Sequence, residues 1–190
     1  MTEIKIEKKP VWPWALLTLI AVALLVYILA ARETPETQTQ PETASLIEVR
    51  ENNATVEAYV RFVEVDSKGM GLDHVYSNTA LTKLIEATNA MADEVNVDVR
   101  ADLDKAKQQA ESITVDKFST SHADSIKNAT GILSNALQKI QQEKYPELAN
   151  EITELKNASV AIKPGVLTLD QKEPIKGFFG KAAEVLKKMN

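Results

Sequence analysis

Residues 119–144, STSHADSIKNATGILSNALQKIQQEK, decide the fold class of this chain. Apolar residues recur there every three or four positions, which is the spacing of one face of an α-helix. Ser119 and Thr120 suit the N-terminal cap, because a hydroxyl oxygen can accept a hydrogen bond from an amide of the first turn. The apolar stripe consists of Ile126, Ala129, Leu133, Ala136, Leu137 and Ile140. The stretch therefore predicts an amphipathic helix that buries one face.

The same periodicity extends along the chain in both directions from this helix. It predicts further helices at about 45–65, 73–95, 98–113, 146–162 and 174–189. Glycine or proline separates several of them, as at Gly69, Gly71 and Pro164. Short connections place successive helices antiparallel. We therefore expect an all-α fold in which about four to six helices form an up-and-down bundle.

A long uncharged run, VWPWALLTLIAVALLVYILAA, occupies residues 11–31. As a helix it would span roughly 30 Å, the thickness of the hydrocarbon core of a bilayer. Trp12 and Trp14 suit the membrane–water interface. The alternative is a cleaved signal peptide, but Leu29 or Ile28 would then stand where a small residue is needed. We therefore predict a single transmembrane helix that binds the lipid bilayer.

The charges on either side of this run predict its orientation. Lys5, Lys8 and Lys9 precede it, whereas the segment that follows is acidic. Lysine and arginine remain on the cytoplasmic side of a membrane. We expect residues 1–10 to form a cytoplasmic tail and the C-terminal domain to be periplasmic or extracellular. The preferred location is the inner membrane of a bacterium, with a single pass.

The exported part divides into three segments by composition. Residues 32–44 lack large apolar side chains and contain Pro35 and Pro41, which predicts a flexible linker. Residues 45–162 carry the predicted bundle. Residues 163–190 contain a loop and a basic amphipathic helix.

Charge is distributed unevenly along a chain whose formal net charge is −5. Acidic residues predominate in 33–162, which argues against nucleic acid as a partner, because an acidic surface repels phosphates. Lysines predominate in 163–190, around an apolar stripe that includes Phe178 and Phe179. That helix could contact an anionic membrane or an acidic partner, or it could be the last helix of the bundle. The candidate contact residues of the whole chain are Trp12, Trp14, Phe178, Phe179, Lys181, Lys187 and Lys188.

The chain has two histidines, and each is predicted to stand at the start of a helix. His74 follows Asp73, and His122 precedes Asp124. Because the two helices run parallel in an up-and-down bundle, these residues should meet at one end. Imidazoles with carboxylates are acceptable ligands for zinc. The alternative is that each histidine is a capping or surface residue. We expect no bound metal and no cofactor.

The sequence contains no recognised catalytic motif. There is no cysteine, no Gly-x-Ser-x-Gly elbow, no glycine-rich phosphate loop and no His-Glu-x-x-His. We therefore expect a non-enzymatic protein with a binding, scaffolding or envelope-maintenance role, acting with a protein partner or as a homo-oligomer. The alternative is a periplasmic ligand- or metal-sensing bundle that acts through a partner membrane protein.

Overall fold

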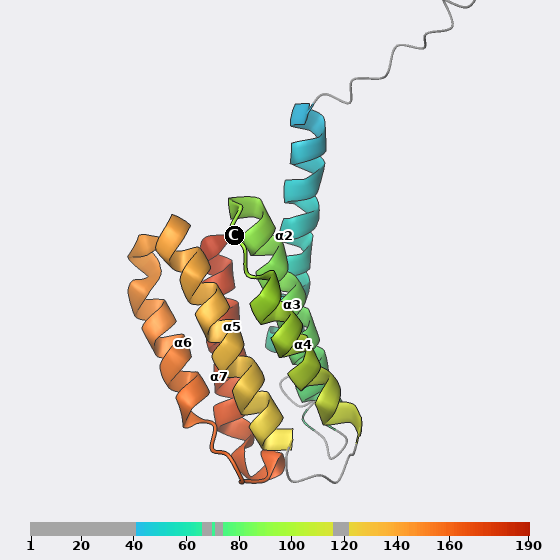
Figure 1. Ribbon diagram of the computed structural model, residues 1–190, viewed down its shortest axis with the longest axis vertical. Helices are drawn as coiled ribbons and strands as arrows, with labels where there is room; N and C mark the ends of the chain where they lie inside the picture. The colour runs from blue at the N-terminus through green and yellow to red at the C-terminus, as the bar shows by residue number, and fades with distance from the viewer. Residues whose placement is uncertain (1–40, 66–69, 71–73, 116–121) are drawn as a thin grey trace, which may run out of the picture. The chain divides into compact units, whose positions relative to one another are not determined.

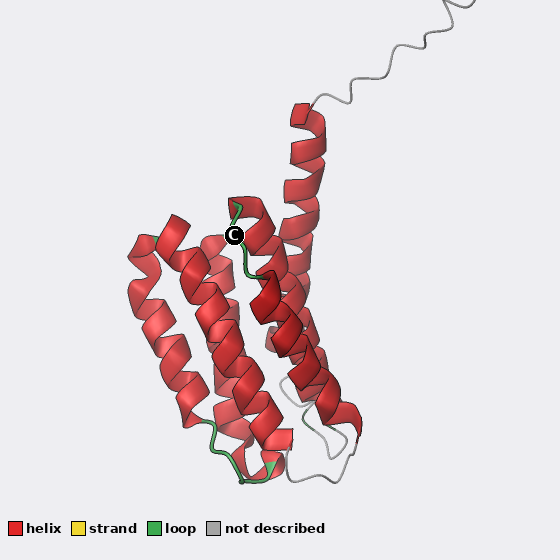
Figure 2. Ribbon diagram, viewed as in Figure 1, coloured by secondary structure: helices red, strands yellow, loops and turns green. Residues whose placement is uncertain are grey.

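A computed structural model describes residues 41–65, 70, 74–115 and 122–190. Within these ranges all regular structure is helical, without any strand (Figures 1 and 2). The elements are α2 (Pro41–Val65), α3 (Val75–Val95), α4 (Arg100–Val115), α5 (His122–Lys144), η1 (Pro146–Leu148), α6 (Ala149–Ala161), η2 (Thr168–Gln171) and α7 (Lys172–Met189). The predicted all-α class is confirmed for this part of the chain.

The predicted transmembrane helix, with Trp12 and Trp14, lies outside the described residues. So does most of the predicted linker, although α2 begins at Pro41, inside the segment expected to be linker. Proline is well suited to the first turn of a helix, where its missing N–H costs least. Among the helices that the structure describes, none is both long and apolar enough to span a membrane.

Four helices form the central bundle of the second unit, Ser45–Asn190. α3 packs against α5 and α7, and α6 packs against the same two helices from the other side. α4 lies over α3 and α5, and it is antiparallel to both (Figure 1). α2 lies beside α3 and α7, to which its aromatic side chains bind. The outer surface of α3 is therefore flanked by α2 and α4.

The apolar stripes predicted from the sequence meet in one core. Leu84 of α3, Leu133 of α5 and Leu155 of α6 are completely inaccessible to solvent. Burial of each such side chain contributes about 1.5–3 kcal/mol relative to exposure. In α4, two of the four residues described as buried are small, namely Ala106 and Ala110. Small side chains allow α4 to approach its neighbours closely.

Two helix starts contain a 3₁₀ turn that the periodicity does not predict. The helix expected from Pro146 begins with the 3₁₀ turn η1, and its α-helical part starts at Ala149. The last helix starts at Lys172, two residues before Pro174, and the turn η2 precedes it. Gln171 holds this junction, since its side chain donates to the carbonyls of Lys163 and Val166 and accepts from the amide of Lys163. Helical periodicity alone does not predict these side-chain hydrogen bonds.

Aromatic and charged contacts attach α2 to the bundle. The hydroxyl of Tyr59 donates to the carbonyl oxygen of Phe179 at 2.8 Å, and both residues are buried. Phe62 stacks on Tyr76 of α3, with ring centres 5.4 Å apart. Glu64 pairs with Lys187 of α7 at 2.9 Å. These contacts all lie in the C-terminal half of α2.

Replacing Tyr59 with phenylalanine should lower the free energy of unfolding by about 1 kcal/mol at neutral pH, because the hydrogen bond is lost while the ring remains. Burial raises the pKa of Tyr59 well above its ordinary value of 10.0, and the neighbouring Tyr76 raises it further. The folded chain therefore keeps a proton that the unfolded chain releases above about pH 10. Stability of the natural chain should fall there, and the variant should lose less.

Urea unfolding at neutral pH and at about pH 11 measures both effects. Tyr145→Phe is the control, because burial and the neighbouring Glu94 and Glu147 also raise the pKa of Tyr145, but this residue lies partly exposed. Tyr145→Phe should therefore reduce the loss of stability at alkaline pH by less than Tyr59→Phe does. An equal alkaline loss in the natural chain and in Tyr59→Phe would contradict the prediction.

Candidate functional site

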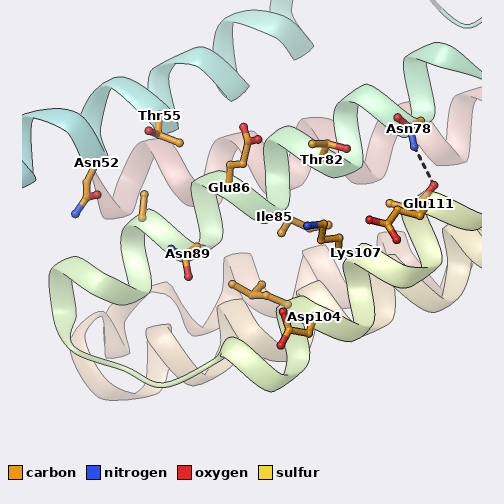
Figure 3. A pocket seen from close by; sticks show the side chains of 13 residues that line it. Asn52, Thr55, Asn78, Thr82, Ile85, Glu86, Asn89, Asp104, Lys107 and Glu111 are labelled. Carbon is orange, nitrogen blue, oxygen red and sulfur yellow. Dashed lines mark hydrogen bonds between the residues drawn. The ribbon is translucent and has the colours of Figure 1, made fainter.

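A groove of about 750 Å³ runs along the outer surface of α3, between α2 and α4. α3 contributes a row of residues from Asn78 to Ala90 along its length, and α4 contributes Leu103 to Glu111 (Figure 3). α2 adds Asn52 and Thr55 at its edge. Three helices therefore supply one elongated depression.

The groove combines an apolar floor with polar walls. Ala90, Leu103 and Ala110 are buried beneath it, and Ile85 is half-buried. The wall residues are Asn52, Thr55, Asn78, Thr82, Glu86, Asn89, Asp104, Lys107 and Glu111. Ligand and peptide sites typically pair apolar contact area with a few placed polar groups. The lining thus offers both contact area and hydrogen-bonding groups.

The walls carry more negative than positive charge. Glu86 of α3 and Asp104 and Glu111 of α4 face a groove in which Lys107 is the lining cation. Near Glu111, the side-chain amide of Asn78 donates to the carbonyl oxygen of Ala110 at 2.9 Å and ties α3 to α4 (Figure 3). The groove therefore favours a cationic ligand over an anionic one.

The side-chain nitrogen of Asn52 lies at the edge of the groove without a hydrogen-bond acceptor. This Nδ2 atom is buried, and no described residue accepts from it. A buried amide without a partner costs about 1–3 kcal/mol. An acceptor on a bound molecule could remove that cost.

The groove was not predicted from the sequence. Asn78, Thr82, Glu86 and Asn89 follow one line along α3 at helical spacing, which is a weak signal for a polar strip on a helix rich in buried residues. Polar strips on helices are usually solvated surface. Only the placement of α2 and α4 on either side turns this strip into a groove.

The two histidines meet at one end of the bundle. The imidazole rings of His74 and His122 are 4.4 Å apart between centres and nearly perpendicular, at 83°. Both residues are buried, with 8% and 2% of their surfaces exposed. His74 is the N-cap of α3, and His122 is the first residue of α5. They are placed together by the parallel direction of α3 and α5.

The carboxylates proposed beside the histidines do not complete a site in the described residues. Asp124 instead accepts a hydrogen bond from the amide of Gly165 at 2.9 Å, which closes the loop before α7. Asp73 lies outside the described residues. In the described part of the chain, no group of three or more histidine, cysteine or acidic residues could hold a metal ion.

The aromatic residues of α7 lie inside the protein. Phe178 and Phe179, predicted candidates for membrane or partner contact, have no exposed surface in the structure. Their rings contact each other with centres 5.7 Å apart, and Phe179 also contacts Tyr76. In this conformation both side chains belong to the core and are not available for contact at the surface.

Three lysines of α7 pair with acidic residues of three helices. Lys181 lies 2.9 Å from Glu154 of α6 and from Glu184 of its own helix, and these hydrogen bonds raise the pKa of Lys181. Lys187 pairs with Glu64 of α2. Lys188 binds Glu151 of α6 and lowers the pKa of that carboxyl group. Exposed pairs of this kind contribute little to stability, because solvent screens the charges.

No protein-family model matches the chain, and neither the curated proteins nor the solved structures yielded a match. The groove and the histidine pair are the structural basis for a functional proposal.

Proposed function

We propose that this chain is a membrane-anchored extracytoplasmic protein whose helical bundle binds or scaffolds another protein and performs no catalysis. The uncharged run at 11–31 and the lysines before it support the anchor and its direction. The groove between α2, α3 and α4 supports the binding role. It is the single observation on which the binding proposal depends.

The dimensions and lining of the groove suit a segment of a protein partner. Its lining follows α3 for about three turns, from Asn78 to Ala90, which matches the length of a short helix or an extended peptide. The floor could bury small apolar side chains, and the side-chain amide of Asn52 could donate to a main-chain carbonyl group. We propose a partner segment that carries lysine or arginine, because three carboxylates outnumber the single lysine in the walls.

Site-specific photocrosslinking of the full chain in its native membrane tests this proposal. A photoreactive residue at Thr82, which is exposed in the groove, should yield one discrete adduct. The same photoreactive residue in place of Lys105 should not yield this adduct, because Lys105 is exposed on α4 but does not line the groove. Mass spectrometry of the adduct should locate the link in a basic segment of the partner.

Charge reversal provides the matched control. Glu86→Lys with Asp104→Lys should abolish the Thr82 adduct, because both side chains are exposed in the groove. Glu143→Lys with Glu173→Lys makes the same change in net charge at exposed positions outside the groove, and the adduct should persist. Loss of the adduct in both double variants, or in neither, would rule out the groove as the binding surface.

A sensing bundle is the second candidate function, and the contact between His74 and His122 favours it. Such a protein would need a partner in the membrane to carry a signal inward. The crosslinking experiment separates the two candidates, because a sensor that works through its histidines does not require an occupied groove.

A further inference from the structure

We propose that His74 and His122 together bind a late transition-metal ion such as Zn²⁺. The chain contains two histidines, and the structure brings both into contact although they belong to different helices. The parallel helices place both residues at one end of the bundle, and the structure in addition buries the two rings against each other. This contact favours a shared role for the two rings over the alternative that each histidine is only a capping or surface residue.

The chemistry of His122 points to a ligand. Only 2% of the surface of this residue is exposed, and neither ring nitrogen has a hydrogen-bond partner among the described residues. Buried polar groups nearly always have a partner, since leaving one without costs about 1–3 kcal/mol. A metal ion accepts the nitrogen lone pair of a neutral imidazole and would satisfy one of these atoms.

The backbone places the second ring against the first. His74 has φ 55° and ψ 13°, a left-handed conformation that residues with a side chain rarely adopt. Its carbonyl oxygen accepts the amide of Asn78 at 3.1 Å, which fixes it to the first turn of α3. Conformations of this kind cost about 1–3 kcal/mol and occur preferentially at functional sites. The strained residue here carries one of the two rings.

The geometry of the pair is compatible with one shared ion. Zinc binds histidine nitrogen at about 2.0–2.1 Å, so two ligating nitrogens lie within about 4 Å of each other. Rings with centres 4.4 Å apart can meet this requirement with small side-chain rotations. The next residue, Val75, is 57% exposed, so the pair lies near the surface at the end of α3. An ion could therefore enter from that end.

The ligand set determines the class of metal. Imidazole nitrogen suits Zn²⁺, Ni²⁺ and Cu²⁺, whereas Mg²⁺ and Ca²⁺ prefer oxygen. Water can fill the coordination positions that the two rings leave open. Two protein ligands predict a modest affinity, weaker than that of a structural zinc site with four.

Equilibrium dialysis against Zn²⁺ tests the proposal on the full chain in detergent, purified without a polyhistidine tag and stripped with a chelator. The natural chain should bind one Zn²⁺, and its thermal midpoint should rise with Zn²⁺ but not with Ca²⁺. His74→Asn and His122→Gln should each bind at least about tenfold more weakly. Asparagine is chosen at position 74 because it tolerates the left-handed conformation.

Asp124→Asn is the matched control at the same end of the bundle. Its amide oxygen can still accept from Gly165, so Zn²⁺ binding should remain unchanged. Circular dichroism checks the fold of each variant, and His122→Gln alone decides the test if His74→Asn loses helicity. Absence of Zn²⁺ binding in the natural chain, or equal binding in the natural chain and a folded histidine variant, would overturn the proposal.

Discussion

Replacing Phe179 with alanine is expected to lower the free energy of unfolding by about 3–5 kcal/mol, the usual cost of removing a buried phenylalanine. The ring has no exposed surface and contacts the rings of Phe178 and Tyr76. The carbonyl of the same residue holds the hydroxyl of Tyr59. A cavity at this position would therefore weaken the contacts of α7 with both α2 and α3.

Urea unfolding followed by circular dichroism measures this loss. Val160→Ala is the control, because Val160 is 72% exposed and its truncation should change stability by less than about 0.5 kcal/mol. An equally small effect of Phe179→Ala would show that α7 does not pack as the structure has it. The alternative in which this helix contacts a membrane or an acidic partner would then regain support.

Gly177→Ala combined with Gly180→Ala is expected to stabilise the protein by about 1–2 kcal/mol. Both glycines lie in the interior of α7, where glycine costs about 0.5–1 kcal/mol relative to alanine. A β-carbon added at either position meets no atom within 4 Å, so alanine can be accommodated without a clash. The gain arises chiefly from the lower conformational entropy of the unfolded chain.

Gly165→Ala is the control, and its effect should have the opposite sign. The surroundings of Gly165 are equally open, but its φ of 70° strains any residue with a side chain. We expect a loss of about 1 kcal/mol. Thermal and urea unfolding of the natural chain, the double variant and Gly165→Ala measure both changes in stability. A double variant less stable than the natural chain would contradict the open surroundings of the two helical glycines.

The all-α class and the core were predictable from the sequence because both depend on helical periodicity. Leu133, Leu137 and Ile140 of α5 face inward, as their spacing predicts. Periodicity reports which face of a helix is buried, but not where the helix starts. The turns η1 and η2 depend on local hydrogen bonds, such as those made by Gln171. Their positions were therefore missed.

The candidate sites, too, were predictable only where they depend on helix direction. Because α3 and α5 run parallel, the sequence placed His74 and His122 at one end, and the structure brings their rings into contact. Asp124 was expected to join the histidines, but it accepts a hydrogen bond from the amide of Gly165. This contact depends on the path of the loop before α7, which the sequence does not indicate. The groove depends on the lateral placement of α2 and α4, which no helical pattern encodes.

The attachment of α2 has a mechanical consequence. Tension transmitted along the chain from residues before Pro41 enters the bundle through this helix. Its anchoring contacts at Tyr59, Phe62 and Glu64 lie within two turns of one another. A pull along the axis of α2 would load them together in shear, whereas a sideways pull would load them in succession, as in unzipping. The protein should therefore resist axial force better than lateral force.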